Sequence, residues 1–152
     1  MFGLIGEVIN LIEEWQPKKW HRNEKGFQQE LATFLRKKLQ ASLFGPKPKV
    51  VTESRIDRAD IQVGKDIGIE MKINLTRSKM KKLVGQIEMY PFSNIIAVVC
   101  GVKDEDAWEE LKEKYESGVL AFGEKHVTLI RKDKSREKRK EKRGLFELDL
   151  GI

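Results

Sequence analysis

An acid and a lysine interrupt the otherwise apolar segment Ile67–Ile73 near the middle of the chain. Glu70 and Lys72 are two residues apart, so in a β-strand their side chains project to the same face of the sheet. A second acid, Asp60, precedes Glu70 with nine residues between them. Carboxylates are ligands that a hard divalent cation such as Mg²⁺ prefers. These residue types predict a metal site on one strand face, with Lys72 near the metal.

The residues between the two acids predict a hairpin that brings them together. Gly64–Asp66 has turn composition, and with this three-residue loop Val63 pairs with Ile67 and Asp60 lies opposite Glu70. This register aligns the apolar side chains of both strands on one face. Opposed carboxylates repel each other at Cβ separations of about 4.5–5.5 Å unless a cation lies between them. The alternative is an ordinary half-exposed strand with alternating charges.

The elements that must position these residues follow from hydrophobic spacing and from turn residues. The pattern predicts helices over residues 2–15, 23–43, 77–90 and 104–116, and strands over 49–54, 59–63, 67–73, 94–100 and 126–130. The first three strands are expected to form an antiparallel meander. Asn23 and Thr76 have the residue types of helix N-caps. The apolar run over 94–100 is typical of a strand buried on both faces.

Asp60 followed by Glu70-x-Lys72 resembles the motif of the PD-(D/E)XK superfamily of restriction-endonuclease-like nucleases. The superfamily's core order of helix, three-strand meander, helix and strand matches residues 23–100. Ala59 stands where the family name implies proline, at a position that varies widely in the superfamily.

The resemblance implies an α/β fold and a single domain over residues 1–152. Its restriction-endonuclease-like core would have the order α-β-β-β-α-β, with a central mixed sheet flanked by helices. An N-terminal amphipathic helix and a linker, residues 1–22, precede this core. That helix could also pair with a copy of itself, which would make a homodimer.

A second motif lies in the helix that follows the Glu-x-Lys strand. Gln86-Ile87-Glu88-Met89-Tyr90 is similar to the Gln-x-x-x-Tyr motif of RecB-type and lambda-exonuclease-like members. A spacing of four places Gln86 and Tyr90 on one side of a helix. The resemblance implies that this pair positions the substrate strand or Lys72. The alternative is a packed tyrosine and a solvated glutamine.

The superfamily often contributes another acid from its first core helix, and Glu24 and Glu30 both qualify. At about 100° per residue, Glu24 falls inside the apolar stripe of this helix and Glu30 falls outside it. We therefore choose Glu24 as the helix acid. Its alternative role is a favourable interaction of a first-turn acid with the helix dipole.

The resemblance implies a Mg²⁺-dependent deoxyribonuclease, a hydrolase of phosphodiester bonds in DNA, with Mn²⁺ as a second usable ion and RNA as the alternative substrate. Asp60, Glu70 and the Met71 carbonyl would hold the metal, Glu24 would assist through water, and Lys72 would orient or activate the attacking water. The rival interpretation is a non-catalytic nucleic-acid-binding or protein-interaction domain of the same fold. Metal binding distinguishes the two.

Three basic regions are candidate phosphate contacts. Arg77, Lys79 and Lys82 lie near a predicted helix N-terminus, which itself favours phosphate. Residues 131–143 hold nine basic and three acidic side chains and therefore carry most of the formal net charge of +6. We expect this segment to stay flexible or to form a charged helix that attracts nucleic acid without sequence preference. Residues 16–22 are basic and aromatic, and predict either a nucleic-acid contact or a linker anchored by Trp20.

Composition limits the remaining classes. Apolar residues make up 39% and charged residues 36% of 152 residues, and there is no run of eighteen apolar residues, so we expect neither a membrane span nor a disordered chain. The one cysteine, Cys100, allows neither an internal disulfide nor a cysteine-based zinc site. The opening residues include Glu7 and no basic leader, so we expect a cytoplasmic protein without a membrane partner.

Overall fold

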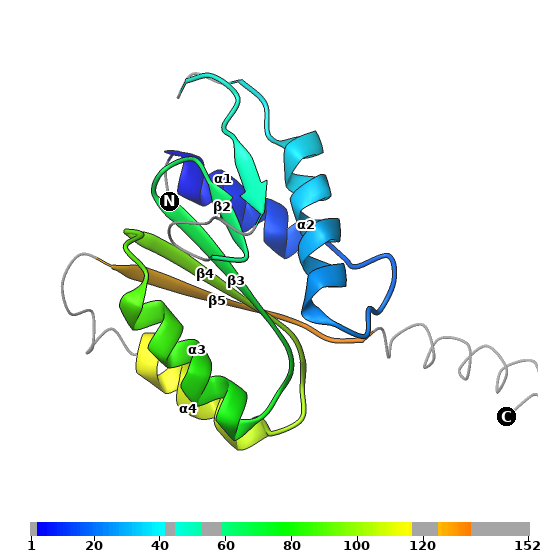
Figure 1. Cartoon of the computed structure of the whole chain (residues 1–152), viewed down its shortest axis with the longest axis vertical. Helices are drawn as coiled ribbons and strands as arrows, with labels where there is room; N and C mark the ends of the chain where they lie inside the picture. The colour runs from blue at the N-terminus through cyan, green and yellow to red at the C-terminus, as the bar shows by residue number, and fades with distance from the viewer. Residues whose placement is uncertain (1–2, 42–44, 53–58, 117–124, 135–152) are drawn as a thin grey trace, which may run out of the picture.

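A computed structural model describes residues 3–41, 45–52, 59–116 and 125–134 of the chain. The described residues form four helices and five strands, shown in Figure 1. In chain order these are α1 (Gly3–Glu14), α2 (Glu24–Lys38), β1 (Val50–Thr52), β2 (Ile61–Val63), β3 (Ile67–Leu75), α3 (Arg77–Met89), β4 (Asn94–Val102), α4 (Glu105–Glu116) and β5 (His126–Lys132).

The five strands form one mixed sheet in the order β1-β2-β3-β4-β5. β1, β2 and β3 pair antiparallel, which confirms the predicted meander, and β3, β4 and β5 run parallel. Val63 pairs with Ile67 and Ile61 pairs with Ile69, so the predicted hairpin register is confirmed. The apolar side chains select this register, because a slip of one residue would turn all of them to the other face.

Each face of the sheet carries its own hydrophobic core and its own pair of helices. Ile67, Ile69 and Met71 of β3 pack in the core that α1 and α2 cover. The opposite core, covered by α3 and α4, includes Leu83 and Trp108. Figure 1 shows the two helix pairs on opposite sides of the sheet. Residues 95–100 of β4 are buried throughout, as predicted for a strand covered on both faces.

The helix N-termini follow the capping residues in the sequence. The Asn23 side chain accepts a hydrogen bond from the Gly26 N–H at 2.8 Å, and Thr76 accepts one from the Lys79 N–H at 3.3 Å. Both predicted N-caps are therefore confirmed. The predicted end of the first core helix at residue 43 is wrong, because α2 ends at Lys38. Leu39 is extended there, and its buried side chain joins the core under α2.

The N-terminal helix buries its apolar face within its own chain. Val8, Ile9 and Ile12 of α1 are part of the core beneath α1 and α2. A second copy is therefore not needed to cover these three side chains, and a homodimer through this helix stays a prediction. None of the helices in the described part of the chain is long and apolar enough to cross a membrane.

The basic segment predicted over residues 131–143 begins inside the sheet, which corrects its predicted flexibility at this end. Arg131 and Lys132 belong to β5, and Lys132 pairs with Cys100 of β4. The Lys132 ammonium is buried and donates to the Glu13 carbonyl at the end of α1, at 2.8 Å. Arg131 forms an ion pair with Glu105 at 2.7 Å. Residues 135–143 lie outside the described residues, so the prediction for them stays open.

Candidate active site

Asp60, Glu70 and Lys72 come together on the strand face that α3 and α4 cover. Glu70 and Lys72 lie within β3, and Asp60 comes directly before β2. Only 3% of Glu70 and 5% of Lys72 are exposed to solvent. Buried ionisable side chains are rare unless they are paired or hold an ion, so this pair is not the ordinary charge alternation of a half-exposed strand.

Short hydrogen bonds fix the two carboxylates. Tyr90, at the end of α3, donates its hydroxyl to Glu70 Oε2 at 2.6 Å, and Lys72 Nζ lies 3.4 Å from Glu70 Oε1. The Met71 N–H donates to Asp60 Oδ2 at 2.7 Å. Glu70 thus bridges a lysine on its own strand and a tyrosine from the covering helix, while the backbone of β3 holds Asp60 beside it.

The two carboxylates compete for ionisation. Burial and, next, the negative charge of Glu70 raise the pKa of Asp60 from 3.8 to about 7. The Met71 N–H and the Lys72 ammonium oppose this shift without cancelling it. Burial and the bond to Glu70 also raise the pKa of Tyr90, so this hydroxyl stays protonated and donates at neutral pH.

A divalent cation fits this donor set. Asp60 and Glu70 supply two carboxylates whose mutual repulsion a positive ion would relieve, and Mg²⁺ in proteins is commonly held by one or two carboxylates with water and phosphate. A strand residue points its N–H and C=O groups toward the same neighbour. Because the Met71 N–H bonds to Asp60, the Met71 carbonyl faces the side on which Asp60 lies.

The two residues of the Gln-x-x-x-Tyr motif differ in the hydrogen bonds that their side-chain oxygens form. Tyr90 contacts Glu70, as described above. The Gln86 side-chain oxygen, one turn earlier on α3, is buried and has no hydrogen-bond partner among the described residues. Such an orphaned acceptor costs roughly 1–3 kcal/mol, so Gln86 is available to a donor that the chain itself does not provide.

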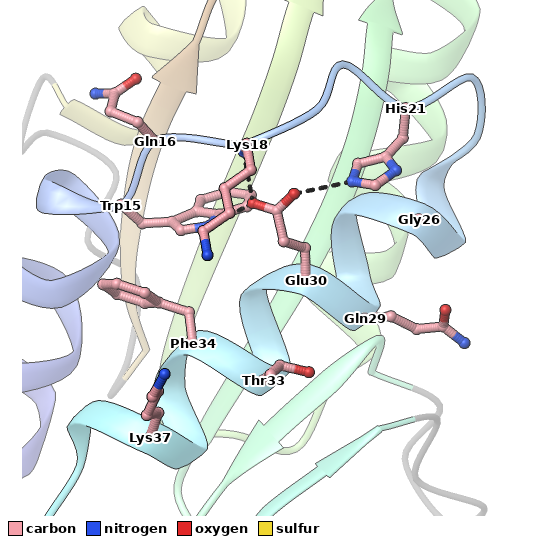
Figure 2. A pocket seen from close by; sticks show the side chains of 10 residues that line it. All are labelled: Trp15, Gln16, Lys18, His21, Gly26, Gln29, Glu30, Thr33, Phe34 and Lys37. Atoms are coloured by element: carbon pink, nitrogen blue, oxygen red, sulfur yellow. Dashed lines mark hydrogen bonds and ion pairs between the residues drawn. The ribbon is translucent and has the colours of Figure 1, made fainter.

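The two candidate acids of α2 differ in what they bind. Glu30 accepts from Trp15 Nε1 at 2.9 Å and from the Lys18 N–H at 3.0 Å, and its second oxygen lies 3.0 Å from His21 Nε2. Glu30 lines a groove of about 520 Å³. Figure 2 shows its carboxylate between Lys18 and His21. Glu30 therefore anchors the segment between α1 and α2.

Glu24 is the α2 acid with an unused oxygen. Its Oε2 atom is buried without a partner in the described part of the chain. However, no three His, Cys, Asp or Glu side chains of the described residues are grouped closely enough to hold a metal ion. The structure thus joins Asp60 and Glu70 as a pair and does not bring Glu24 into it.

Two of the three predicted phosphate contacts are engaged within the protein. Arg77 donates to Glu110 at 2.8 Å, and Lys79 donates to the Ile73 carbonyl of β3 at 2.7 Å. The Arg77–Glu110 pair is exposed, so it adds little stability and can be exchanged for a phosphate. Lys82 is exposed on α3.

The backbone is left-handed at two residues near the site, which the sequence pattern did not predict. Asn74, two residues after Lys72, has φ 48°, and Gly101 on the adjacent strand has φ 86°. Asparagine and glycine are the residues that tolerate this left-handed conformation. β3 extends past this point to Leu75, two residues beyond its predicted end.

Comparisons of the chain with family models, curated proteins and solved structures give no match.

Proposed function

We propose that the chain is a metal-dependent nuclease that hydrolyses phosphodiester bonds in DNA, on a core of the restriction-endonuclease-like type. The observation that carries the proposal is the contact of the buried pair Glu70 and Lys72 on β3 with the half-buried Asp60 carboxylate that precedes β2. Two opposed acids that raise a pKa to about 7 destabilise a sheet unless a cation or a proton is bound. A divalent ion together with a phosphate is the ligand that this charge pattern suits.

Asp60, Glu70 and the Met71 carbonyl would hold the ion. When bound, Mg²⁺ supplies positive charge that stabilises a phosphate as negative charge accumulates on it. The remaining roles belong to the chain's own residues. Lys72 carries its ammonium at the edge of the carboxylate pair and orients the attacking water toward the phosphate. Tyr90 keeps Glu70 in place, since its hydroxyl donates to that carboxylate.

The unpaired Gln86 oxygen supports a role for the Gln-x-x-x-Tyr helix in substrate binding. An amide oxygen accepts from a donor, and a water molecule or the amino group of a base provides one. Lys82, on the same helix, is exposed and suited to a phosphate of the bound strand.

The test is incubation of the purified chain with linear, circular and branched DNA, and with RNA, in Mg²⁺ or in EDTA. We expect cleavage of DNA that requires the metal and is lost in Glu70→Gln, which keeps the side-chain size. Cleavage of RNA alone would change the substrate class. Binding of DNA without cleavage in Mg²⁺ or Mn²⁺ would favour the non-catalytic alternative and overturn the proposal.

A further inference from the structure

The surface has a second hollow, and its charged lining residues are basic. A hollow of about 650 Å³ lies where the segment after α1 enters α2, and we call it the α2 hollow. It is lined by Lys19, Trp20, His21, Arg22, Asn23, Lys25, Gly26 and Gln29. Its charged lining residues, Lys19, Arg22 and Lys25, are all cationic and exposed, and no acid lines it. The chemistry of this lining suits a polyanion.

The loop that forms the α2 hollow is held in a fixed shape. Trp20 and His21 both pack edge-on against the buried Phe27 ring, with centroids 5.0 Å and 4.9 Å away. His21 is also tied to Glu30 at 3.0 Å, which holds its ring in place. These anchors reduce the entropy that would be lost when a ligand orders the loop.

Gly26 is required for this shape. A Cβ atom at Gly26 would lie 2.6 Å from the His21 ring, which is closer than real side chains approach. Figure 2 shows the His21 ring beside Gly26 at the start of α2. Any larger residue at position 26 must therefore displace the ring and the loop. A substitution at Gly26 therefore changes the shape of the α2 hollow without changing its charge.

The α2 hollow lies beside the end of the strand that carries the candidate active site. The closest approaches to a Cβ atom built on Gly101 are Asn74 Oδ1 at 3.1 Å and Trp20 Cζ2 at 3.3 Å. Trp20 thus sits at the carboxyl ends of β3 and β4, next to Asn74. Two fully extended strand residues span about 6.6 Å, and Asn74 is left-handed, so Asn74 lies no more than roughly that far along the strand from Lys72.

We propose that the α2 hollow binds the sugar–phosphate backbone of the nucleic-acid substrate beside the cleavage site, without reading its sequence. This inference rests on the proposed function for the identity of its ligand. The α2 hollow is lined by exposed lysine and arginine side chains and by the polar residues Asn23 and Gln29. These are residue types that commonly contact phosphates. The positive end of the α2 dipole points to the same place. Of the two interpretations of residues 16–22, the linker anchored by Trp20 is confirmed, and the nucleic-acid contact is the one proposed here.

The test measures binding without chemistry. Labelled duplex DNA is titrated in EDTA with the full chain, the Lys19→Gln/Arg22→Gln variant and the control Lys49→Gln/Lys65→Gln, over a salt series. The control removes the same charge from exposed lysines around the β1–β2–β3 hairpins. We expect the first variant to bind several-fold more weakly, with a salt slope smaller by about 1.8, since each lost phosphate contact lowers the slope by about 0.9. The control slope should stay near that of the full chain.

Gly26→Ala provides the charge-neutral arm of the test. It should weaken DNA binding because it displaces His21, and circular dichroism shows whether the fold survives. Equal salt slopes for the full chain and Lys19→Gln/Arg22→Gln would overturn the proposal, and so would an equal loss in both double variants. If DNA binds as expected but is never cleaved in Mg²⁺, the proposed nuclease function fails and the α2 hollow stands as a nucleic-acid contact.

Discussion

At the scale of single residues, the Asp60 carboxyl links the candidate active site to stability. Its pKa is raised from 3.8 to about 7, so the folded chain holds this proton over a range where the unfolded chain has lost it. Stability from this group is therefore complete below about pH 4 and is lost as the pH rises to about 7. The loss continues no further at higher pH, because the carboxyl is then ionised in both states.

Asp60→Asn should remove this dependence on pH. The variant should be more stable than the wild type at pH 8 by about 1–3 kcal/mol, because the amide keeps the shape and carries no charge to repel Glu70. Urea denaturation in EDTA at pH 5 and pH 8 measures the difference. Asp66→Asn, at an exposed acid of the β2–β3 turn, is the control. An equal decline between the two pH values in wild type and Asp60→Asn would contradict the assignment.

Tyr90 is a positioning residue in this account, because it acts through Glu70. Its hydroxyl donates to Glu70 at 2.6 Å and fixes that carboxylate, so Tyr90→Phe should lower the cleavage rate and raise the Mg²⁺ concentration needed for half-maximal cleavage. Tyr115→Phe is a matched control, since the Tyr115 hydroxyl is buried without a partner in the described structure. A lower rate with an unchanged dependence on Mg²⁺ concentration would indicate a packing role only.

At the scale of elements, the two acids of α2 have different expected roles: Glu30 in stability and Glu24 in cleavage. Glu30→Gln should destabilise the chain by about 1–3 kcal/mol, because the carboxylate holds Trp15, Lys18 and His21. The predicted role of Glu24 acts through water and does not require direct contact with Asp60 or Glu70, so Glu24→Gln should impair cleavage more than Glu30→Gln when both are compared well below their melting temperatures. Thermal denaturation and single-turnover cleavage separate the two effects. The reverse order in cleavage would show that the helical-face argument chose the wrong acid.

The sequence was most informative where short-range geometry decides the outcome. The three-residue loop at Gly64–Asp66 and the apolar alternation determine the hairpin register, and thereby the approach of Asp60 to Glu70. Capping residues located the starts of α2 and α3 for the same reason. The end of α2 was missed because residues after Lys38 can continue a helix, and burial of Leu39 in the core decides where it stops.

The predicted end of β5 was two residues short because charged residues follow Ile130. Arg131 and Lys132 break the apolar pattern after Ile130, yet both belong to the strand. Their partners are the Glu105 carboxylate and the Glu13 carbonyl, which are distant in sequence. The left-handed pair Asn74 and Gly101 could not be predicted either, because it depends on contacts between neighbouring strands and the Trp20 loop.

At the scale of the whole molecule, basic side chains gather in two candidate contact regions, the α2 hollow and residues 135–143, and the second of these lies outside the described residues. Deleting residues 135–143 should weaken DNA binding similarly for all sequences and reduce the salt slope, since fewer counterions are released. Single-turnover cleavage at saturating enzyme should change little, because Asp60, Glu70 and Lys72 lie elsewhere. An unchanged salt slope would show that this segment does not contact nucleic acid.

The central claim is that the carboxylate pair formed by Asp60, before β2, and Glu70, in β3, supports metal-dependent cleavage. Single-turnover cleavage of DNA in Mg²⁺ at pH 8, with enzyme in excess, tests it most directly when wild type, Asp60→Asn and the control Asp66→Asn are compared. The account predicts that Asp60→Asn loses about 10²-fold or more in rate while remaining folded, that Asp66→Asn cleaves at the wild-type rate, and that EDTA stops both active proteins. Cleavage by Asp60→Asn at the wild-type rate would contradict it.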